Sequence, residues 1–289
     1  MVMSGLSRII INADDFGWSS AVNEAVLDAA ENGVLSSATV MANMPGFEEA
    51  VREAKFLPKL GVGVHLNLLR GAPVRDPKTI KSLVGKDGRF LQDNSKLLLR
   101  FVMKQIYLEE VEEELSAQVK RVIDAGLKPT HIDSEKHMHI LFPQLWHVVC
   151  KIALRFDVRR IRIAREFFIA GLSLKSPKQL AKALVVKYRC KGLAKVAFKH
   201  GLHSTDNFFG IALAGNMTTS VYKKLFGRLP RGTTEIMCHP GAKETTPGEI
   251  ACSGWLDRGR VKEYLALVDP KTKEALMKSG AELINFGDI

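Results

Sequence analysis

A regular alternation of β-rich runs and helical segments extends along nearly the whole chain, and it constrains the fold more than any other feature. β-Rich runs at residues 8–17, 36–43 and 60–68 are separated by helical patterns that begin near Ser19 and Pro45. Such alternation predicts parallel strands joined by crossover helices. We therefore expect an α/β fold whose strands form a distorted, closed or nearly closed (β/α) barrel. An open doubly wound sheet is the alternative.

The rest of the chain continues this alternation, with one interruption. Residues 70–89 read as a long loop, and a long helical pattern at 95–125 is broken near Tyr107. Residues 167–203 are predicted to form a basic helical insertion. A barrel of this length is commonly one domain, so residues 1–289 are expected to form a single domain. The further predicted strands lie at 129–133, 158–164, 234–238 and 281–286, and the further predicted helices at 143–156, 219–229, 260–267 and 270–279.

The positive charge of the chain is concentrated in one segment. The whole chain carries a formal net charge of +11, and residues 151–200 alone hold 14 Lys and Arg against the acids Asp157 and Glu166. The excess therefore describes one surface rather than the fold. Within this segment, residues 174–200 interleave lysines with Leu, Val and Ala, as do helices that lie in a membrane interface. A solvated cationic helix packed on the barrel is the alternative.

Neither the cysteines nor the N-terminus indicates a secreted protein. The four cysteines are dispersed and form no Cys-x-x-Cys pair, which favours a reducing compartment. The chain reaches acids by Asp14, so neither a signal peptide nor a membrane span is expected. We expect a cytoplasmic protein, with peripheral contact to the inner face of the membrane through residues 174–200 as an added hypothesis.

Polar clusters fall where four of the predicted strands end. They are Asp14 with Asp15, His65, the run at 131–139, and His239. Ligands of parallel α/β proteins bind at the carboxyl ends of the strands, so these clusters are expected to converge. Adjacent residues of an extended chain point to opposite faces. Asp14 and Asp15 can therefore share one site only if the backbone bends there.

The run at residues 131–139 concentrates imidazoles and carboxylates. His131, Asp133, Glu135 and His137 alternate along the chain and would point the same way from an extended strand. Burying such a face without partners is costly, and a divalent cation resolves the cost. A bound divalent ion can lower the pKa of its water from about 15.7 towards about 7, and a nearby carboxylate can then take the proton.

These clusters resemble the conserved blocks of a known family. The chain is similar, in matching order and from residue 8 to about residue 241, to the YdjC-like carbohydrate deacetylases. That family includes chitooligosaccharide deacetylases and the hopanoid-associated HpnK proteins, and its layout is similar to that of NodB-type polysaccharide deacetylases. The resemblance implies a barrel-like fold and a hydrolase that uses magnesium or zinc to remove acetyl groups from N-acetylated sugars. The blocks are Asn12-Ala13-Asp14-Asp15-Phe16-Gly17, Gly63-Val64-His65, His131-Ile132-Asp133-Ser134 with His137 and His139, and Glu235-Ile236-Met237-Cys238-His239-Pro240.

The resemblance also implies roles for individual residues. It makes Asp14 the general base, Asp15 and His65 metal ligands, and His239 the general acid or oxyanion partner. Family members often have histidine at the position of Glu135. Either Glu135, through oxygen, or His137 is therefore expected to complete the metal site. The expected substrate contacts are Asp133, His139, Phe209 and Trp255, with a core position as the alternative for Phe209.

The sequence leaves alternatives open for both the substrate and the class of function. The expected substrate is an N-acetylated oligosaccharide, or a glycolipid such as an N-acetylglucosaminyl hopanoid brought to the site by the basic insertion. One rival is a catalytically altered barrel that acts as a membrane- or polyanion-binding adaptor, and another is a different metal-dependent amidase or phosphoesterase. Aromatic residues are sparse near the lysines and no nucleic-acid motif is found, so no nucleic-acid partner is expected. A homodimer is a further hypothesis.

Overall fold

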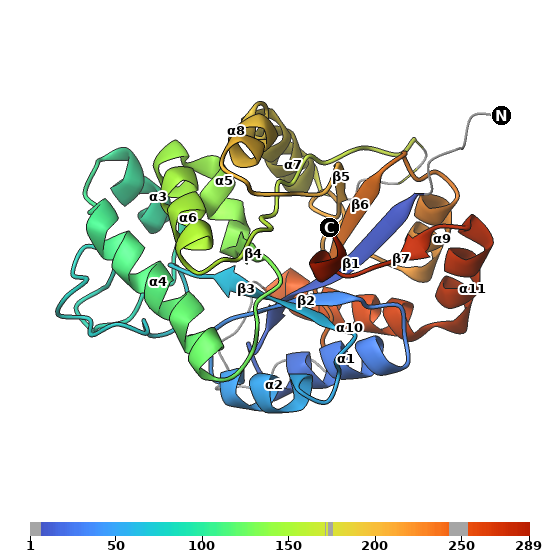
Figure 1. The fold of residues 1–289 in the computed structure, drawn as a ribbon, viewed down its shortest axis with the longest axis horizontal. Coiled ribbons are helices and arrows are strands. Elements are labelled where there is room, and N and C mark those ends of the chain that lie inside the picture. Colours follow the sequence, from blue (N-terminus) through green and yellow to red (C-terminus); the bar gives the residue numbers. More distant parts are fainter. Residues whose placement is uncertain (1–6, 171, 173–175, 243–253) are drawn as a thin grey trace.

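The strands form one curled parallel sheet (Figure 1). The computed structural model describes residues 7–170, 172, 176–242 and 254–289, with side chains in the last range from residue 258. The sheet order is β4-β3-β2-β1-β6-β5, β7 pairs with the start of β1, and every pairing is parallel. The predicted α/β fold with parallel strands is confirmed. The strands are β1 (Arg8–Phe16), β2 (Ser37–Val40), β3 (Gly61–Leu66), β4 (Ile132–Ser134), β5 (Asn207–Phe209), β6 (Thr233–Cys238) and β7 (Glu282–Leu283).

The two edges of this sheet are joined by the segment at residues 158–166. Ile161 forms a single parallel bridge to Ile132 in β4, and Glu166 forms another to Phe208 in β5. The segment therefore takes the place of a strand between the edges, and the curled sheet approaches a closed barrel. The prediction of a regular strand at 158–164 is wrong, because the chain there makes isolated bridges instead of a continuous ladder.

The helices begin and end largely where local sequence signals place them. The Ser19 hydroxyl accepts a hydrogen bond from the Val22 amide and caps the first helix, and Pro143 begins α6, where no backbone N–H is needed. The predicted break near Tyr107 separates α3 from α4. The helices are α1 (Ser20–Glu31), α2 (Phe47–Ala54), α3 (Asn94–Val102), α4 (Leu108–Asp124), α5 (Met138–Leu141), α6 (Pro143–Arg155), α7 (Pro177–Arg189), α8 (Leu193–Lys199), α9 (Thr219–Phe226), α10 (Gly254–Val268) and α11 (Pro270–Ser279), with the 3-10 turns η1 (Glu135–His137) and η2 (Phe286–Asp288).

The predicted basic insertion contains α7 and α8, which lie near α5 and β5 (Figure 1). The inner side of α7 buries Ala183 and Val186. Its outer side exposes Leu184 by 50%, Val185 by 53% and Tyr188 by 66%. The helix thus presents apolar side chains both to the protein and to the surface.

The interior of the barrel becomes more polar along β1. Alternate side chains point inward, and they begin with Ile10, which packs against Ile284 and Phe286. Asn12 and Asp14 follow on the same side of the strand, towards its carboxyl end. The apolar end of the barrel therefore gives way to a charged layer at the end where ligands of parallel α/β proteins bind.

His131 belongs to the layer between these two. Its ring stacks on Phe286 with centroids 3.7 Å apart, and its Nε2 lies 3.1 Å from the Asn12 side-chain oxygen. A Cβ atom at Gly63 would lie 2.5 Å from this ring, so β3 needs glycine there. His131 is a core residue that supports the charged layer from below.

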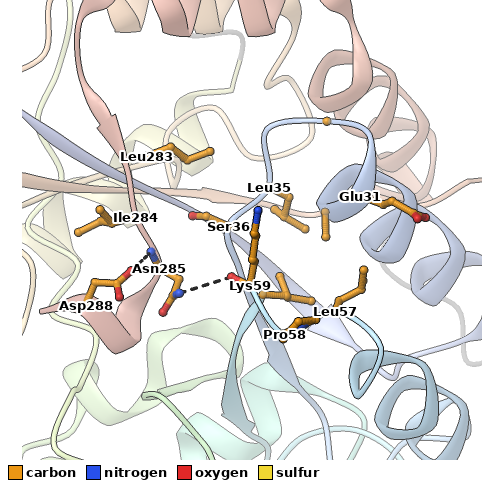
Figure 2. Close-up of a pocket in the computed structure, with 13 residues that line it drawn as sticks. Glu31, Leu35, Ser36, Leu57, Pro58, Lys59, Leu283, Ile284, Asn285 and Asp288 are labelled. Carbon is orange, nitrogen blue, oxygen red and sulfur yellow. Dashed lines mark hydrogen bonds between the residues drawn. The ribbon is translucent and has the colours of Figure 1, made fainter.

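A sizeable cavity lies at the opposite end of the barrel. Figure 2 shows this pocket of about 670 Å³, between the residues that precede β2 and β3 and those that follow β7. Its lining includes Leu35, Lys59 and Asn285, and it contains none of the His and Asp residues singled out in the sequence. Among the described helices, none is long and apolar enough to span a membrane.

Candidate active site

One buried arginine organises the charged layer of the barrel. Arg162, from the segment that joins β4 to β5, is fully buried and donates to both carboxylate oxygens of Asp14, at 2.7 and 2.8 Å. The same guanidinium lies 2.5 Å from Asp133 Oδ2 and 2.6 Å from Glu235 Oε1. Burial opposes the charge, but the carboxylates of Asp133, Asp14 and Glu235 outweigh burial and raise the pKa of Arg162. One cation therefore fixes three carboxylates.

His65 is oriented by this cluster. Its Nδ1 donates to Asp133 Oδ1 at 2.7 Å, and the Thr39 hydroxyl donates to the other oxygen of Asp133. Burial lowers the pKa of His65, but Asp133, Glu135 and Asp14 outweigh burial and raise it well above its ordinary value, so a cation bound at Nε2 would replace a proton there while Asp133 keeps the ring oriented through Nδ1. Nε2 faces Asp15 Oδ1 and Glu135 Oε2, each at 3.5 Å.

A bend in the backbone brings Asp14 and Asp15 to the same site. Asp15 has φ of 67°, in the left-handed region, and the register of β1 against β2 shifts between Ala13 and Phe16. Asp15 therefore turns towards His65 instead of pointing away from Asp14. Its Oδ2 accepts from Arg260 at 2.5 Å, whereas its buried Oδ1 has no hydrogen-bond partner among the described residues.

Glu135 has a similar arrangement on the other side of His65. Its Oε1 lies 3.0 Å from the Lys136 ammonium, and its Oε2 faces His65. Lys136 and His137 both have positive φ, at 56° and 59°, so the chain is sharply turned where β4 ends. Each carboxylate is thus held by a cation through one oxygen and offers the other oxygen to the cluster.

These atoms fit a divalent cation. Asp15, His65 and Glu135 each offer one ligand atom, and the three atoms lie within 4.8 Å of one another. Asp14, His65 and Asp133 form a second such group, but Arg162 and His65 already engage those carboxylates. Two carboxylates and one imidazole are a donor set that magnesium, manganese or zinc can accept. One of the carboxylate oxygens, Asp15 Oδ1, is buried and has no hydrogen-bond partner among the described residues.

A small pocket adjoins the cluster. Its volume is about 40 Å³, which corresponds to roughly three water-sized groups, or to the three heavy atoms of an acetyl group. The buried His137 ring meets Phe208 edge-on at 6.0 Å, and its Nδ1 has no hydrogen-bond partner among the described residues. The pocket is lined by Asp14, Glu135, Lys136, His137, Gln179, Lys182, Ile211, Ala214, Met237 and His239.

His239 reaches the pocket from the end of β6. Its backbone amide donates to Glu263 at 2.6 Å, and its Nε2 lies 4.0 Å from Asp14 Oδ2. Burial lowers the pKa of His239 to about 4, although Asp14 and Asp15 act in the opposite direction. The imidazole is therefore neutral near pH 7, a state that suits a hydrogen-bond donor better than a general acid.

The four residues expected to contact the substrate do not lie together in the structure. Asp133 is fully buried behind His65, and His139 uses both ring nitrogens, with the Ser134 hydroxyl at 2.5 Å and the Arg162 carbonyl at 2.9 Å. Phe209 is buried against Phe167 in the core. None of these three lines the small pocket. The side chain of Trp255 lies outside the described residues.

Several residues of the site were not predicted from the sequence. Arg162 carried a weak signal, because a charged residue stands between Ile161 and Ile163 in a predicted strand. Glu263 had none, since it lies on α10 and only the fold brings it to the backbone amide of His239. The contribution of α7 to the pocket also depends on tertiary packing.

The fold and the site together define a class of protein, in which a parallel α/β barrel carries two carboxylates and an imidazole at the carboxyl ends of its strands. The chain belongs to the YdjC-like protein family, whose model matches residues 8–278. This confirms the resemblance inferred from the sequence blocks.

Known relatives are similar over the whole chain. A carbohydrate deacetylase from Geobacillus stearothermophilus is 34% identical over 283 residues, which cover 97% of each chain. A carbohydrate deacetylase from Clostridium beijerinckii is 30% identical over 284 residues, covering 98% of this chain and 100% of the relative. The crystal structure of an Enterococcus faecalis V583 protein named for cellobiose-phosphate cleavage matches with a TM-score of 0.75 and 26% identity, over 98% of both chains.

Proposed function

We propose that this protein is a divalent-metal-dependent carbohydrate deacetylase that removes the acetyl group from an N-acetylated amino sugar. The observation that carries the proposal is the convergence of Asp15, His65 and Glu135 beside Asp14, at a pocket of acetyl size. The names of the relatives give the reaction class. An adaptor would not need this convergence of groups.

The residues of the candidate site would each have a separate role in amide hydrolysis. Asp15, His65 and Glu135 would hold a magnesium or zinc ion, which supplies Lewis acidity when bound. Asp14 is fixed by Arg162, and a carboxylate oxygen has more than one lone pair, so Asp14 can still take a proton from the attacking water. That proton can pass to the departing nitrogen. Neutral His239 can donate a hydrogen bond to the acyl oxygen as negative charge develops.

A glycolipid substrate, met at a membrane surface, is the finer form of this proposal. It is supported by the exposed apolar residues Leu184, Val185 and Tyr188 on α7 and by Phe198 on α8, which stand among exposed lysines. Such a surface suits the interface of an anionic membrane. An N-acetylglucosaminyl hopanoid at the inner face of the membrane is the example that the HpnK resemblance suggests.

Acetate release tests the proposed function. Wild type should release acetate from at least one member of a panel of N-acetylglucosamine conjugates, with magnesium, manganese or zinc added. Asp14→Asn should lower kcat by about 10²–10⁴-fold, the usual contribution of a general base. Asp124→Asn, at an exposed ion pair, is the matched control and should behave as wild type. No acetate from any conjugate with any of these metals would refute the assignment.

A further inference from the structure

The helical insertion forms one wall of the acetyl-sized pocket. Gln179 and Lys182, three residues apart on α7, both line it. Ala183 and Val186, on the same side of the helix, are buried against the body of the protein. The inner face of α7 therefore turns two polar side chains towards the site instead of closing it with apolar ones.

Lys182 is a cation that no described residue pairs with. The charged groups around it are Lys136 and Glu135 of η1, Asp14 of β1, and Glu166. Asp14 is held by Arg162 and Glu135 by Lys136, and Glu166 accepts from backbone amides. Among the described residues, Lys182 makes neither an ion pair nor a side-chain hydrogen bond.

The charge of Lys182 persists at neutral pH. Burial, and then the nearby Lys136, lower the pKa of Lys182 to about 8. The ammonium form therefore predominates near pH 7. Lys182 is half-buried, so water can solvate its ammonium in the empty pocket, and a bound ligand that carries negative charge would take the place of that water.

The deacetylation reaction supplies negative charge at this place. Water adds to the acyl carbon, the carbon–nitrogen bond breaks, the amine leaves with a proton, and acetate remains. The acyl oxygen carries negative charge in the tetrahedral intermediate, and the product is an anion. The pocket volume of about 40 Å³ matches the three heavy atoms of an acetyl group.

We propose that Lys182 is a substrate-contacting residue, whose ammonium donates a hydrogen bond to the acyl oxygen during hydrolysis and to the acetate product afterwards. The inference rests on the proposed function. It gives the insertion a direct part in the reaction, and it makes the wall formed by Gln179 and Lys182 select acetyl over longer acyl groups.

Three variants test the contact. Lys182→Met should lower kcat by about 10²-fold with a smaller change in KM, as expected when one donor to the oxyanion is lost. Lys182→Arg keeps the charge and should recover part of that loss. Lys178→Met, at an exposed position of the same helix, should match wild type. Thermal unfolding of each variant checks that the fold is intact.

Acetate binding provides a readout that does not depend on turnover. Sodium acetate titrated into the magnesium-loaded protein should bind about 10-fold or more weakly to Lys182→Met than to wild type, because a hydrogen bond to a charged group is lost. Sodium butyrate should bind more weakly than acetate to wild type. Equal acetate affinity in Lys182→Met and Lys178→Met would overturn the inference.

The two proposals fail in different ways. If wild type releases acetate and Lys182→Met turns over at the same rate, the inference is overturned and the proposed function stands. If no conjugate releases acetate but acetate binding still depends on Lys182, the contact with acetate stands, and its part in hydrolysis falls with the proposed function.

Discussion

In the proposed metal site, Glu135 would supply the second carboxylate of the ligand set and so influence which divalent ion the site prefers. Carboxylates suit magnesium and manganese, whereas imidazole suits zinc. Glu135→His should therefore raise the ratio of zinc to magnesium affinity by about 10-fold or more, or about 1.4 kcal/mol. Isothermal titration of each metal into metal-free protein measures this ratio.

The control for this experiment is Glu274→His, on the surface of α11, which should leave both affinities unchanged. A Glu135→His variant with an unaltered zinc-to-magnesium ratio would contradict a ligand role for residue 135. Asp15→Asn should weaken both metals, because it removes a negative charge from a carboxylate whose Oδ1 has no hydrogen-bond partner among the described residues.

Arg162 should be the residue whose loss costs the barrel most. Arg162→Met would leave Asp14, Asp133 and Glu235 buried without their shared cation, and breaking a buried ion pair typically costs about 3–5 kcal/mol. Urea unfolding measures the change. Arg155→Met, at an exposed ion pair with Glu112, should change stability by less than about 1 kcal/mol. A similar effect of the two substitutions would contradict a central role for Arg162.

Sequence reasoning predicted side chains at strand ends but not those that act through tertiary contacts. Asp14, Asp15, His65 and Glu135 lie at the carboxyl ends of strands or directly after them, and the topology of a parallel sheet places these ends at one edge. The bend at Asp15 and the curling of the sheet then bring the side chains together. Among the described residues, Glu135 and not His137 lies in the group with Asp15 and His65 that could hold a metal ion. Whether Lys182 faces the site depends on how α7 packs, and no local pattern encodes that.

At the scale of elements, Glu166 connects the segment at 158–166 to the turn after β5. Its carboxylate accepts from the backbone amides of Gly210, Ile211 and Ala212. Burial raises the pKa of Glu166 from 4.5 to about 7, although these donors act in the opposite direction. Between these pH values the folded chain holds a proton that the unfolded chain has lost, so this group contributes less stability as pH rises.

The variant Glu166→Gln removes this titration. The stability of Glu166→Gln relative to wild type should therefore improve between pH 5 and pH 8, by up to roughly 3 kcal/mol for a shift of this size. Urea unfolding of both proteins at the two pH values measures the difference, and other titrating groups cancel in it. A difference that stays constant or moves the other way would show that the amides keep the carboxylate ionised.

The sequence predicted elements well where local signals are strong. The start of α1 has a serine cap, α6 begins with proline, and β1 is a β-branched run. The segment at 158–164 has the same β-rich composition but spans the gap between two sheet edges, where it forms only isolated bridges. β5 was missed because three residues are too few to show a periodic pattern.

At the scale of the whole molecule, the alternation of strands and helices was sufficient to predict the parallel α/β architecture. It did not predict the polar interior, because the residues that fill it come from distant strands. Asn12, His65, Asp133, Arg162 and Glu235 meet only after the sheet curls. The same curling places the basic insertion beside the candidate active site. The exposed basic and apolar surface of the insertion therefore lies next to the small pocket.

This arrangement leads to a prediction about membrane binding. Wild type should co-sediment with anionic vesicles at low salt and less so as salt increases, because the exposed lysines of α7 and α8 attract the lipid headgroups. Replacing the exposed apolar residues Leu184, Val185 and Tyr188 of α7 by serine should reduce binding severalfold at fixed salt, since apolar area would no longer enter the interface.

Two further variants distinguish vesicle binding through this surface from nonspecific attraction between a basic protein and anionic lipids. Reversing Lys178, Lys187, Lys191, Lys195 and Lys199 to glutamate should abolish sedimentation with anionic vesicles. Replacing the exposed apolar residues Phe56 and Met277, which lie outside the insertion, by serine should leave binding at the wild-type level. Binding that survives the charge reversal, or that is lost equally with Phe56 and Met277, would refute a docking role for α7 and α8. A soluble N-acetylated oligosaccharide would then be favoured over a glycolipid as the substrate.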